Sequence, residues 1–217
     1  SFEGGLVIID PASFFDYSTG YYVEIDSNAI QDAAGQFFEG FIDPAAWNFS
    51  TTADFTLLPN NIWGVRYAEL ALGDVDNDGD LDILLAGSRG SQFMTTLYCN
   101  DQGIFTNMGA GLPGVESGGA DWGDMDNDGD LDLILTGKAI VGSYYTPISR
   151  IYRNDNGNFI DLDAALTGVW DSEAAWGDYD NDGDLDLLLS GEAIGGTSYI
   201  PITRIYRNDD GLFTDIV

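Results

Sequence analysis

The sequence contains no histidine, a single lysine and only seven basic side chains in all, against 37 acidic ones. Without histidine the chain lacks the most frequent general base of enzymes. A formal net charge of −30 repels phosphate backbones and anionic membrane surfaces. We therefore expect no nucleic-acid partner and no insertion into a membrane.

Other features are scarce as well. The one cysteine, Cys99, has no partner for an intrachain disulfide, and we interpret it as incidental. No apolar run approaches the roughly 18 residues of a spanning helix, and nothing at Ser1 resembles a signal peptide, so we expect a mature or excised form. Long helical periodicity is absent, whereas 28 glycines, short apolar runs and many Asn-Asp-Gly turns predict a globular, all-β chain.

One acidic motif occurs three times. It reads "GDVDNDGDLDILLAG" at 73–87, "GDMDNDGDLDLILTG" at 123–137 and "GDYDNDGDLDLLLSG" at 177–191, and together these loops hold 15 of the 37 acids. Each is followed by a related segment, "TLYCNDQGIF", "SRIYRNDNGNF" or "TRIYRNDDGLF". The second spacing is four residues longer than the first, and the extra residues fall between Gly137 and Tyr152, which predicts an exposed turn there.

Each repeated unit is expected to contain four short strands. In the second unit they are "GADWG" before the loop, "LDLILTG" after it, then "SRIYRN" and, beyond an Asn-Asp-x-Gly turn, "NFIDL". Four strands in about 50 residues are typical of a propeller blade. We predict three blades, at about 55–107, 108–161 and 162–217.

Residues 1–54 have a different pattern. Alternating segments such as "YYVEIDSNAIQDAAGQFFEG" and a closing aromatic segment, "AAWNFSTTAD", suggest part of a β-sandwich. A complete immunoglobulin-type sandwich needs about 100 residues and seven strands, so we predict a partial one.

Each Asp-rich loop has the spacing of a hard-cation site. In D-x-D-x-D-G-D-x-D the side chains of positions 1, 3, 5 and 9 point inward, position 7 offers its carbonyl, and glycine at position 6 permits a sharp turn. All-oxygen ligation of high charge favours calcium over zinc or copper. We predict three Ca²⁺ sites, with Asp80, Asp130 and Asp184 acting through their carbonyls. The site residues are Asp74, Asp76, Asp78, Asp80 and Asp82; Asp124, Asp126, Asp128, Asp130 and Asp132; and Asp178, Asp180, Asp182, Asp184 and Asp186.

The charge density of these loops predicts that calcium is structural. Two like charges about 4 Å apart repel by roughly 4 kcal/mol at an effective dielectric near 20.

An EF-hand needs an acidic ligand at position 12 and flanking helices, but that position holds Leu85, Leu135 or Leu189, followed by β-formers. The loop is therefore predicted to join two strands.

The repeated segments resemble the FG-GAP/VCBS-type repeats of integrin α-subunit propellers and of secreted bacterial proteins. The resemblance covers 55–217 and implies calcium ligation at the loop positions named above. Residues 15–54 resemble the C-terminal half of a bacterial Ig-like domain. Together they imply an extracellular, secreted or cell-surface protein. Such propellers commonly have about seven blades, and three blades cannot close a ring. Neighbouring domains or further copies of the chain are therefore expected to supply the missing blades.

Several other side chains have two interpretations. Trp122 and Trp176 are expected to be core residues rather than sugar-stacking platforms, and the same holds for Trp47, Trp63 and Trp170. The Tyr-Arg-Asn-Asp segments at 152–155 and 206–209 are expected to form turns in which arginine pairs with nearby acids, rather than glycan sites. Asn48-Phe49-Ser50 matches the N-glycosylation triplet, but such triplets are common by chance, so it is weak evidence for glycosylation.

Three functions remain open from the sequence. The first is an extracellular, calcium-stabilised structural or adhesive module that assembles head-to-tail into a filament. The second is a glycan- or ligand-binding module acting through loops at 139–147 and 193–201. The third is an accessory domain of a secreted polysaccharide-degrading enzyme. The chain itself is predicted not to be an enzyme, because no serine or cysteine has an evident base beside it.

Overall fold

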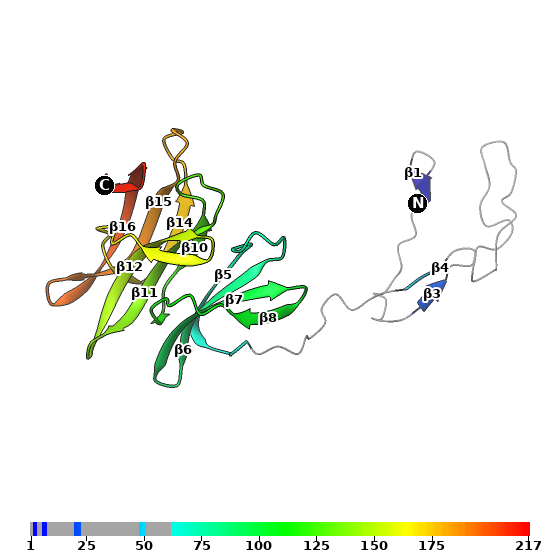
Figure 1. Ribbon diagram of the computed structural model, residues 1–217, viewed down its shortest axis with the longest axis horizontal. Coiled ribbons are helices and arrows are strands. Elements are labelled where there is room, and N and C mark those ends of the chain that lie inside the picture. The colour runs from blue at the N-terminus through cyan, green and yellow to red at the C-terminus, as the bar shows by residue number, and fades with distance from the viewer. Residues whose placement is uncertain (1, 4–5, 8–19, 23–47, 51–61) are drawn as a thin grey trace, which may run out of the picture. The chain divides into compact units, whose positions relative to one another are not determined.

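The computed structural model describes residues 62–217 and four short strands before them (Figure 1). The chain divides into two compact units, Ser1–Leu58 and Pro59–Val217. In the first unit, β1 (Phe2–Glu3) pairs with β2 (Leu6–Val7), and β3 (Gly20–Tyr22) pairs with β4 (Asn48–Ser50), both antiparallel. Three predictions concern residues outside the described ones: the partial Ig-like sandwich, the core role of Trp47 and the domain boundary between 54 and 55. They stay predictions.

The second unit contains three antiparallel meanders, here called repeats 1, 2 and 3. Within the described residues there is no helix, and so none that could cross a membrane. The predicted all-β class is confirmed, and each repeat has the predicted four-strand order, with the first strand of repeat 2 divided into two short strands. Repeat 1 is β5 (Arg66–Gly73), β6 (Asp82–Arg89), β7 (Gln92–Asp101) and β8 (Ile104–Asn107); repeat 2 is β9 (Val115–Glu116), β10 (Ala120–Gly123), β11 (Asp132–Val141), β12 (Tyr144–Asp155) and β13 (Asn158–Asp161); repeat 3 is β14 (Val169–Gly177), β15 (Asp186–Gly195), β16 (Ser198–Asp209) and β17 (Leu212–Asp215).

Narrow contacts link the repeats into one 13-stranded sheet. Met94 of β7 pairs with Val115, and Ile148 of β12 pairs with Val169, one residue pair at each junction. Two further backbone bonds cross between repeats: Ser117 N donates to Tyr67 O at 3.1 Å, and Asp171 N donates to Ser117 O at 2.7 Å. The same junction is therefore built twice.

Alternating side chains of the central strands form the core between repeats. Leu84 and Leu97 of repeat 1 share one buried cluster with Leu133 and Leu135 of repeat 2. The intervening Ile134 faces the other way, into the cluster that repeat 3 completes. Because β11 is covered on both faces, its sequence reads as a continuous apolar run rather than an alternating one.

Two predictions about exposed positions have opposite outcomes. The four-residue insertion lengthens the β11–β12 hairpin, whose tip at Gly142 and Tyr144 is exposed, as expected. The prediction that Trp63 is a core residue was wrong, because half of its surface is exposed. The guanidinium of Arg89 lies 3.7 Å from the centroid of its ring, so the indole packs against a cation instead of the core.

A glycine at each junction permits close backbone approach, and this gives a testable prediction. A Cβ at Gly168 would overlap the carbonyl oxygen of Pro147, whereas no described residue lies within 4 Å of a Cβ at the equivalent Gly64. We expect Gly168→Ala to lower the free energy of unfolding by about 1–3 kcal/mol. The control Gly64→Ala should change it by less than about 0.5 kcal/mol. Urea denaturation measures both, and equal effects would contradict this account of the junction.

Candidate metal centre

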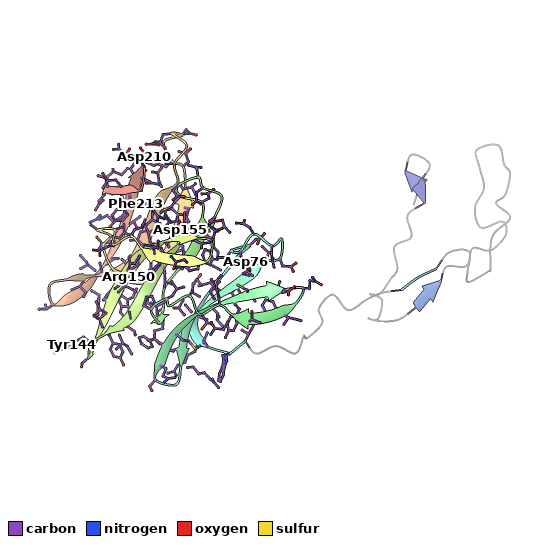
Figure 2. The ribbon with its side chains drawn as sticks, viewed as in Figure 1. Asp76, Tyr144, Arg150, Asp155, Asp210 and Phe213 are labelled. Atoms are coloured by element: carbon purple, nitrogen blue, oxygen red, sulfur yellow. The ribbon has the colours of Figure 1, made fainter. Side chains whose placement is uncertain are left out.

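The three Asp-rich loops occupy the same place in each repeat. They connect β5 to β6, β10 to β11 and β14 to β15, so each joins the first full strand of a repeat to its second. Asp76 marks the loop of repeat 1 in Figure 2. The prediction that the loop joins two strands is confirmed.

The backbone of each loop bends at two positions that favour left-handed geometry. Asn77, Asn127 and Asn181 have φ between 59° and 62°, and asparagine tolerates this conformation better than most residues. Two residues later Gly79, at φ 96°, turns the chain again where a Cβ would be strained. These turns keep the loop aspartates close together.

Carboxylates at positions 1 and 5 hold the loop closed. Asp74 accepts hydrogen bonds from the backbone N–H of Asp78 and Gly79, both at 3.0 Å, and Asp78 accepts one from Asp80 N at 2.9 Å. Repeats 2 and 3 have the same set, with distances of 2.9–3.2 Å. Charge-assisted bonds of this kind stabilise the ionised carboxylate.

The position-9 aspartate is buried and joins three segments. Asp132 is fully buried, with one oxygen accepting from Met125 N at 2.9 Å and the other from Asn154 N at 2.8 Å. Asp82 and Asp186 make the equivalent bonds in repeats 1 and 3. Each therefore ties the loop and the second strand to the third strand of its own repeat.

Carboxylate oxygens converge in every loop. In each group one ligand oxygen per residue lies within 4.8 Å of the others. The groups are Asp74, Asp76 and Asp78 in repeat 1, Asp124, Asp126 and Asp132 in repeat 2, and Asp178, Asp180 and Asp186 in repeat 3. In repeat 1 the Cys99 sulfur also lies this close to Asp76 and Asp82. A cluster of hard anionic oxygens suits calcium.

Burial and repulsion raise the pKa of several of these carboxyls. Burial is the main cause of the rise in the pKa of Asp132 to about 6, with repulsion from Asp126 and Asp128 adding to it and the two N–H donors opposing it. The pKa of Asp82 rises for the same reasons. A cation that compensated this charge would relieve both effects.

The position-7 aspartates use their carboxylates for another purpose. Asp80 accepts from Gln102 N at 2.8 Å, Asp130 from Asn156 N at 2.8 Å and Asp184 from Asp210 N at 3.2 Å. Each bond fixes the turn between the third and fourth strands. This occupation of the side chain agrees with a ligand role through the carbonyl, which stays a prediction.

The asparagine of the Tyr-Arg-Asn-Asp segment was missed as a structural residue. Asn154 is fully buried, accepts from Gly157 N at 2.7 Å and donates through Nδ2 to Val75 O at 3.2 Å in the neighbouring loop. Asn208 donates in the same way to Met125 O at 3.1 Å. The recurrence of this asparagine in all three repeats was a signal that the sequence offered. The sequence could not show that the side chains of Asn154 and Asn208 contact another repeat.

A second asparagine links one Asp-rich loop to the next. Asn77 Nδ2 donates to Asp130 Oδ1 at 3.0 Å, and Asn127 Nδ2 donates to Gly183 O at 3.3 Å. The loops therefore stack along one side of the three repeats. Loop position 4, which the ligand pattern leaves undefined, makes this contact.

The alternatives for the aromatic and arginine residues are resolved in part. Trp122 and Trp176 are partly buried against the two core clusters, as predicted. Arg153 pairs with Asp155 at 3.0 Å and Arg207 with Asp209 at 2.7 Å, which confirms the expected pairing of arginine with nearby acids. Trp170 is also partly buried and lies 4.7 Å below the Lys138 ammonium.

Comparison with known families agrees with this geometry. Residues 74–135 match the model of the FG-GAP-like repeat family. The chain contains an FG-GAP-like repeat. The match begins at the first aspartate of loop 1 and ends within β11, so it includes two Asp-rich loops and the junction between repeats 1 and 2. No curated protein matches the chain. The resemblance to FG-GAP repeats, predicted for 55–217, is thereby confirmed for residues 74–135.

The raised pKa of Asp132 predicts how the metal-free chain responds to pH. Because the folded-state pKa, about 6, exceeds the ordinary value of 3.8, folding takes up a proton. Its stabilising contribution is fully present below pH 3.8 and is lost as the pH rises through about 6, by about 3 kcal/mol at most. In chelator, the melting temperature should therefore fall between about pH 4 and 6.

A matched pair of variants separates this effect from the overall acidity of the chain. Asp132→Asn should flatten the pH dependence, although it also removes one of the two N–H bonds, because the amide nitrogen of Asn cannot accept a hydrogen bond. Asp163→Asn removes the same charge at an exposed position and should retain the slope. If both variants keep the wild-type pH slope, Asp132 is not the group responsible.

Proposed function

We propose that residues 62–217 form a calcium-stabilised structural or adhesive module of an extracellular bacterial protein, secreted or held at the cell surface. The observation that carries this proposal is the threefold recurrence of one carboxylate cluster at equivalent loops of stacked repeats. A unique active site would not need three copies, whereas a scaffold uses one stabilising device in each unit.

The residues present fit calcium. Each cluster offers only carboxylate oxygens, apart from the nearby Cys99 sulfur in repeat 1, and the loop carbonyls add further hard ligands. Asp74, Asp124 and Asp178 would hold the ion from the start of each loop, and the buried position-9 aspartates would hold it from the second strand. The bound ion supplies positive charge that offsets the repulsion among these groups.

We propose that the three meanders are propeller-type blades. Each has four antiparallel strands, the first of which is divided into β9 and β10 in repeat 2, the repeats pack face to face through apolar clusters, and the sequence contains an FG-GAP-like repeat. In this arrangement the Asp-rich loops fix where the second strand begins and leave the β11–β12 and β15–β16 hairpin tips exposed at the other end of the strands. Millimolar extracellular calcium would keep even weak sites filled.

Calcium titration tests the metal assignment. We expect three ions per chain, and a site held at about 100 times its dissociation constant adds roughly 2.7 kcal/mol to the free energy of unfolding. The melting temperature in calcium should therefore exceed that in chelator by many degrees. Isothermal titration calorimetry and thermal melts measure the two quantities. Identical melts in calcium and chelator would refute a structural role for the ion.

A single-site variant sharpens the assignment. Asp126→Asn removes one ligand charge from the cluster of repeat 2, so the stoichiometry should fall from three ions to two, or one site should weaken about tenfold or more. The exposed Asp163→Asn should bind three ions as the wild type does. Three unchanged affinities in Asp126→Asn would remove this residue from the ligand set.

A glycan-binding role is a second candidate, favoured by the aromatic hairpin tips. Tyr144 is 79% exposed and lies at the end of β12 remote from Asp155 (Figure 2). Nearby, Tyr145 stacks on Phe93 with centroids 5.6 Å apart, and Phe93 lines a hollow of about 430 Å³. Exposed tyrosines beside a hollow suit the apolar faces of sugar rings.

A glycan array tests this second role. Tyr144→Ala should reduce binding of any recognised glycan about tenfold, whereas Ile104→Ala, a change at another exposed position, on β8, should leave it unchanged. An array without hits, in calcium, would argue against the glycan role and leave the structural role as it stands.

A further inference from the structure

The outer face of repeat 3 has an open pocket where repeats 1 and 2 have a packed contact. A Cβ at Gly73 would lie 2.9 Å from Leu131 Cδ1 and 3.0 Å from Trp122 Cδ1, both from repeat 2. At Gly123, Trp176 and Leu185 of repeat 3 occupy the same positions. These contacts show what each repeat places against its predecessor.

At Gly177, the equivalent glycine of repeat 3, no described residue lies within 4 Å of such a Cβ. The glycine instead lines a largely apolar pocket of about 270 Å³ together with Trp176, Leu188 and Ile205. Leu188 is 47% exposed, although its counterparts Leu84 and Ile134 are fully buried under the following repeat. The pocket therefore has the shape of a junction that lacks its second half.

Repeat 1 exposes the side chains that would fill that pocket. Leu72 and Leu81 stand at the sequence positions of Trp122 and Leu131, and they are 53% and 57% exposed. In repeats 2 and 3 the residues at these two positions pack over the preceding glycine. Repeat 1 has no repeat before it within the described residues, so its pair has no glycine to cover.

Polar contacts at the two faces are complementary in the same register. The bonds from Asn154 to Val75 O and from Asn208 to Met125 O would continue with Asn100 donating to Tyr179 O. The loop contacts made by Asn77 and Asn127 would continue with Asn181 donating to the carbonyl of Gly79 in the next loop. Each face thus offers the group that the other needs.

We propose that repeat 1 of a second copy of this chain docks on the outer face of repeat 3 and reproduces the two internal junctions. Leu72 and Leu81 of the incoming copy cover Gly177, and its Gly64 allows the approach to the Pro201 carbonyl that Gly168 allows to Pro147. The contact joins different faces of the two copies, so successive copies form an open chain or a closed ring.

The acidity of the chain sets the conditions for this contact. Two molecules with a net charge of −30 repel each other, and the Asp-rich loops would lie side by side across the new junction. Moderate salt screens the first effect, and bound cations offset the second. The docking proposal itself rests on the apolar and backbone contacts rather than on the metal assignment.

Sedimentation velocity of the full chain in calcium and about 0.15 M salt tests the proposal. We expect the mass to increase with concentration. Leu72→Glu and Leu188→Glu each place a charge on one docking face at an exposed position, so each variant should fold but weaken self-association at least tenfold. Thermal melts recorded alongside report folding and calcium binding separately from association.

Mixing the two variants is the decisive step. Leu72→Glu keeps the repeat 3 face, and Leu188→Glu keeps the repeat 1 face, so an equimolar mixture should form one-to-one complexes at concentrations where each variant alone stays monomeric. Leu212→Glu is the control, because Leu212 is 68% exposed and its counterpart Asn158 stays exposed in repeat 2, between two junctions. A wild-type chain that stays monomeric, association that survives both substitutions, or a mixture that fails to associate would overturn the proposal.

Discussion

Repulsion among the aspartates of each loop is the constraint on which the rest of the described structure depends. Five carboxylates within nine residues would push the loop open if they faced one another without compensation. The fold offsets part of this cost with backbone N–H donors: Asp74 takes two, and Asp82 takes one from the loop and one from β7. The same bonds that hold the charge also define where the strands begin.

The buried position-9 aspartate connects this electrostatic device to the architecture. Asp132 lies between the loop, the second strand and the third strand, and Asn154, which donates to it, also reaches the loop of the preceding repeat. Asn154 therefore links the loop carboxylate of its own repeat to a junction between repeats by hydrogen bonds. Calcium, in the function proposed here, would stabilise both the loop and the contact with its neighbour.

Stacking gives the three repeats a direction. Each repeat has a glycine on one face and a Trp-Leu pair, or Leu72 and Leu81 in repeat 1, on the other, and at both internal junctions the pair of the later repeat covers the glycine of the earlier one. Because the two faces differ, a stack grows from unlike ends, and its acidic loops gather on one side while its aromatic hairpins extend on the other. A structural module with ligand-binding tips would use both sides.

The sequence by itself determined the repeat, the strand order and the candidate ligands, because alternation, turn residues and ligand spacing are all local properties. It also placed the four-residue insertion in an exposed hairpin, since added length is tolerated where no neighbour packs. Only the tertiary structure decided which faces meet: it showed Trp63 exposed against Arg89, gave Asn154 and Asn77 their roles between repeats, and left Gly177 uncovered among the described residues. The two asparagine contacts join residues about 50 to 80 positions apart, and their partners are set by the packing of one repeat on another rather than by any pattern within a repeat.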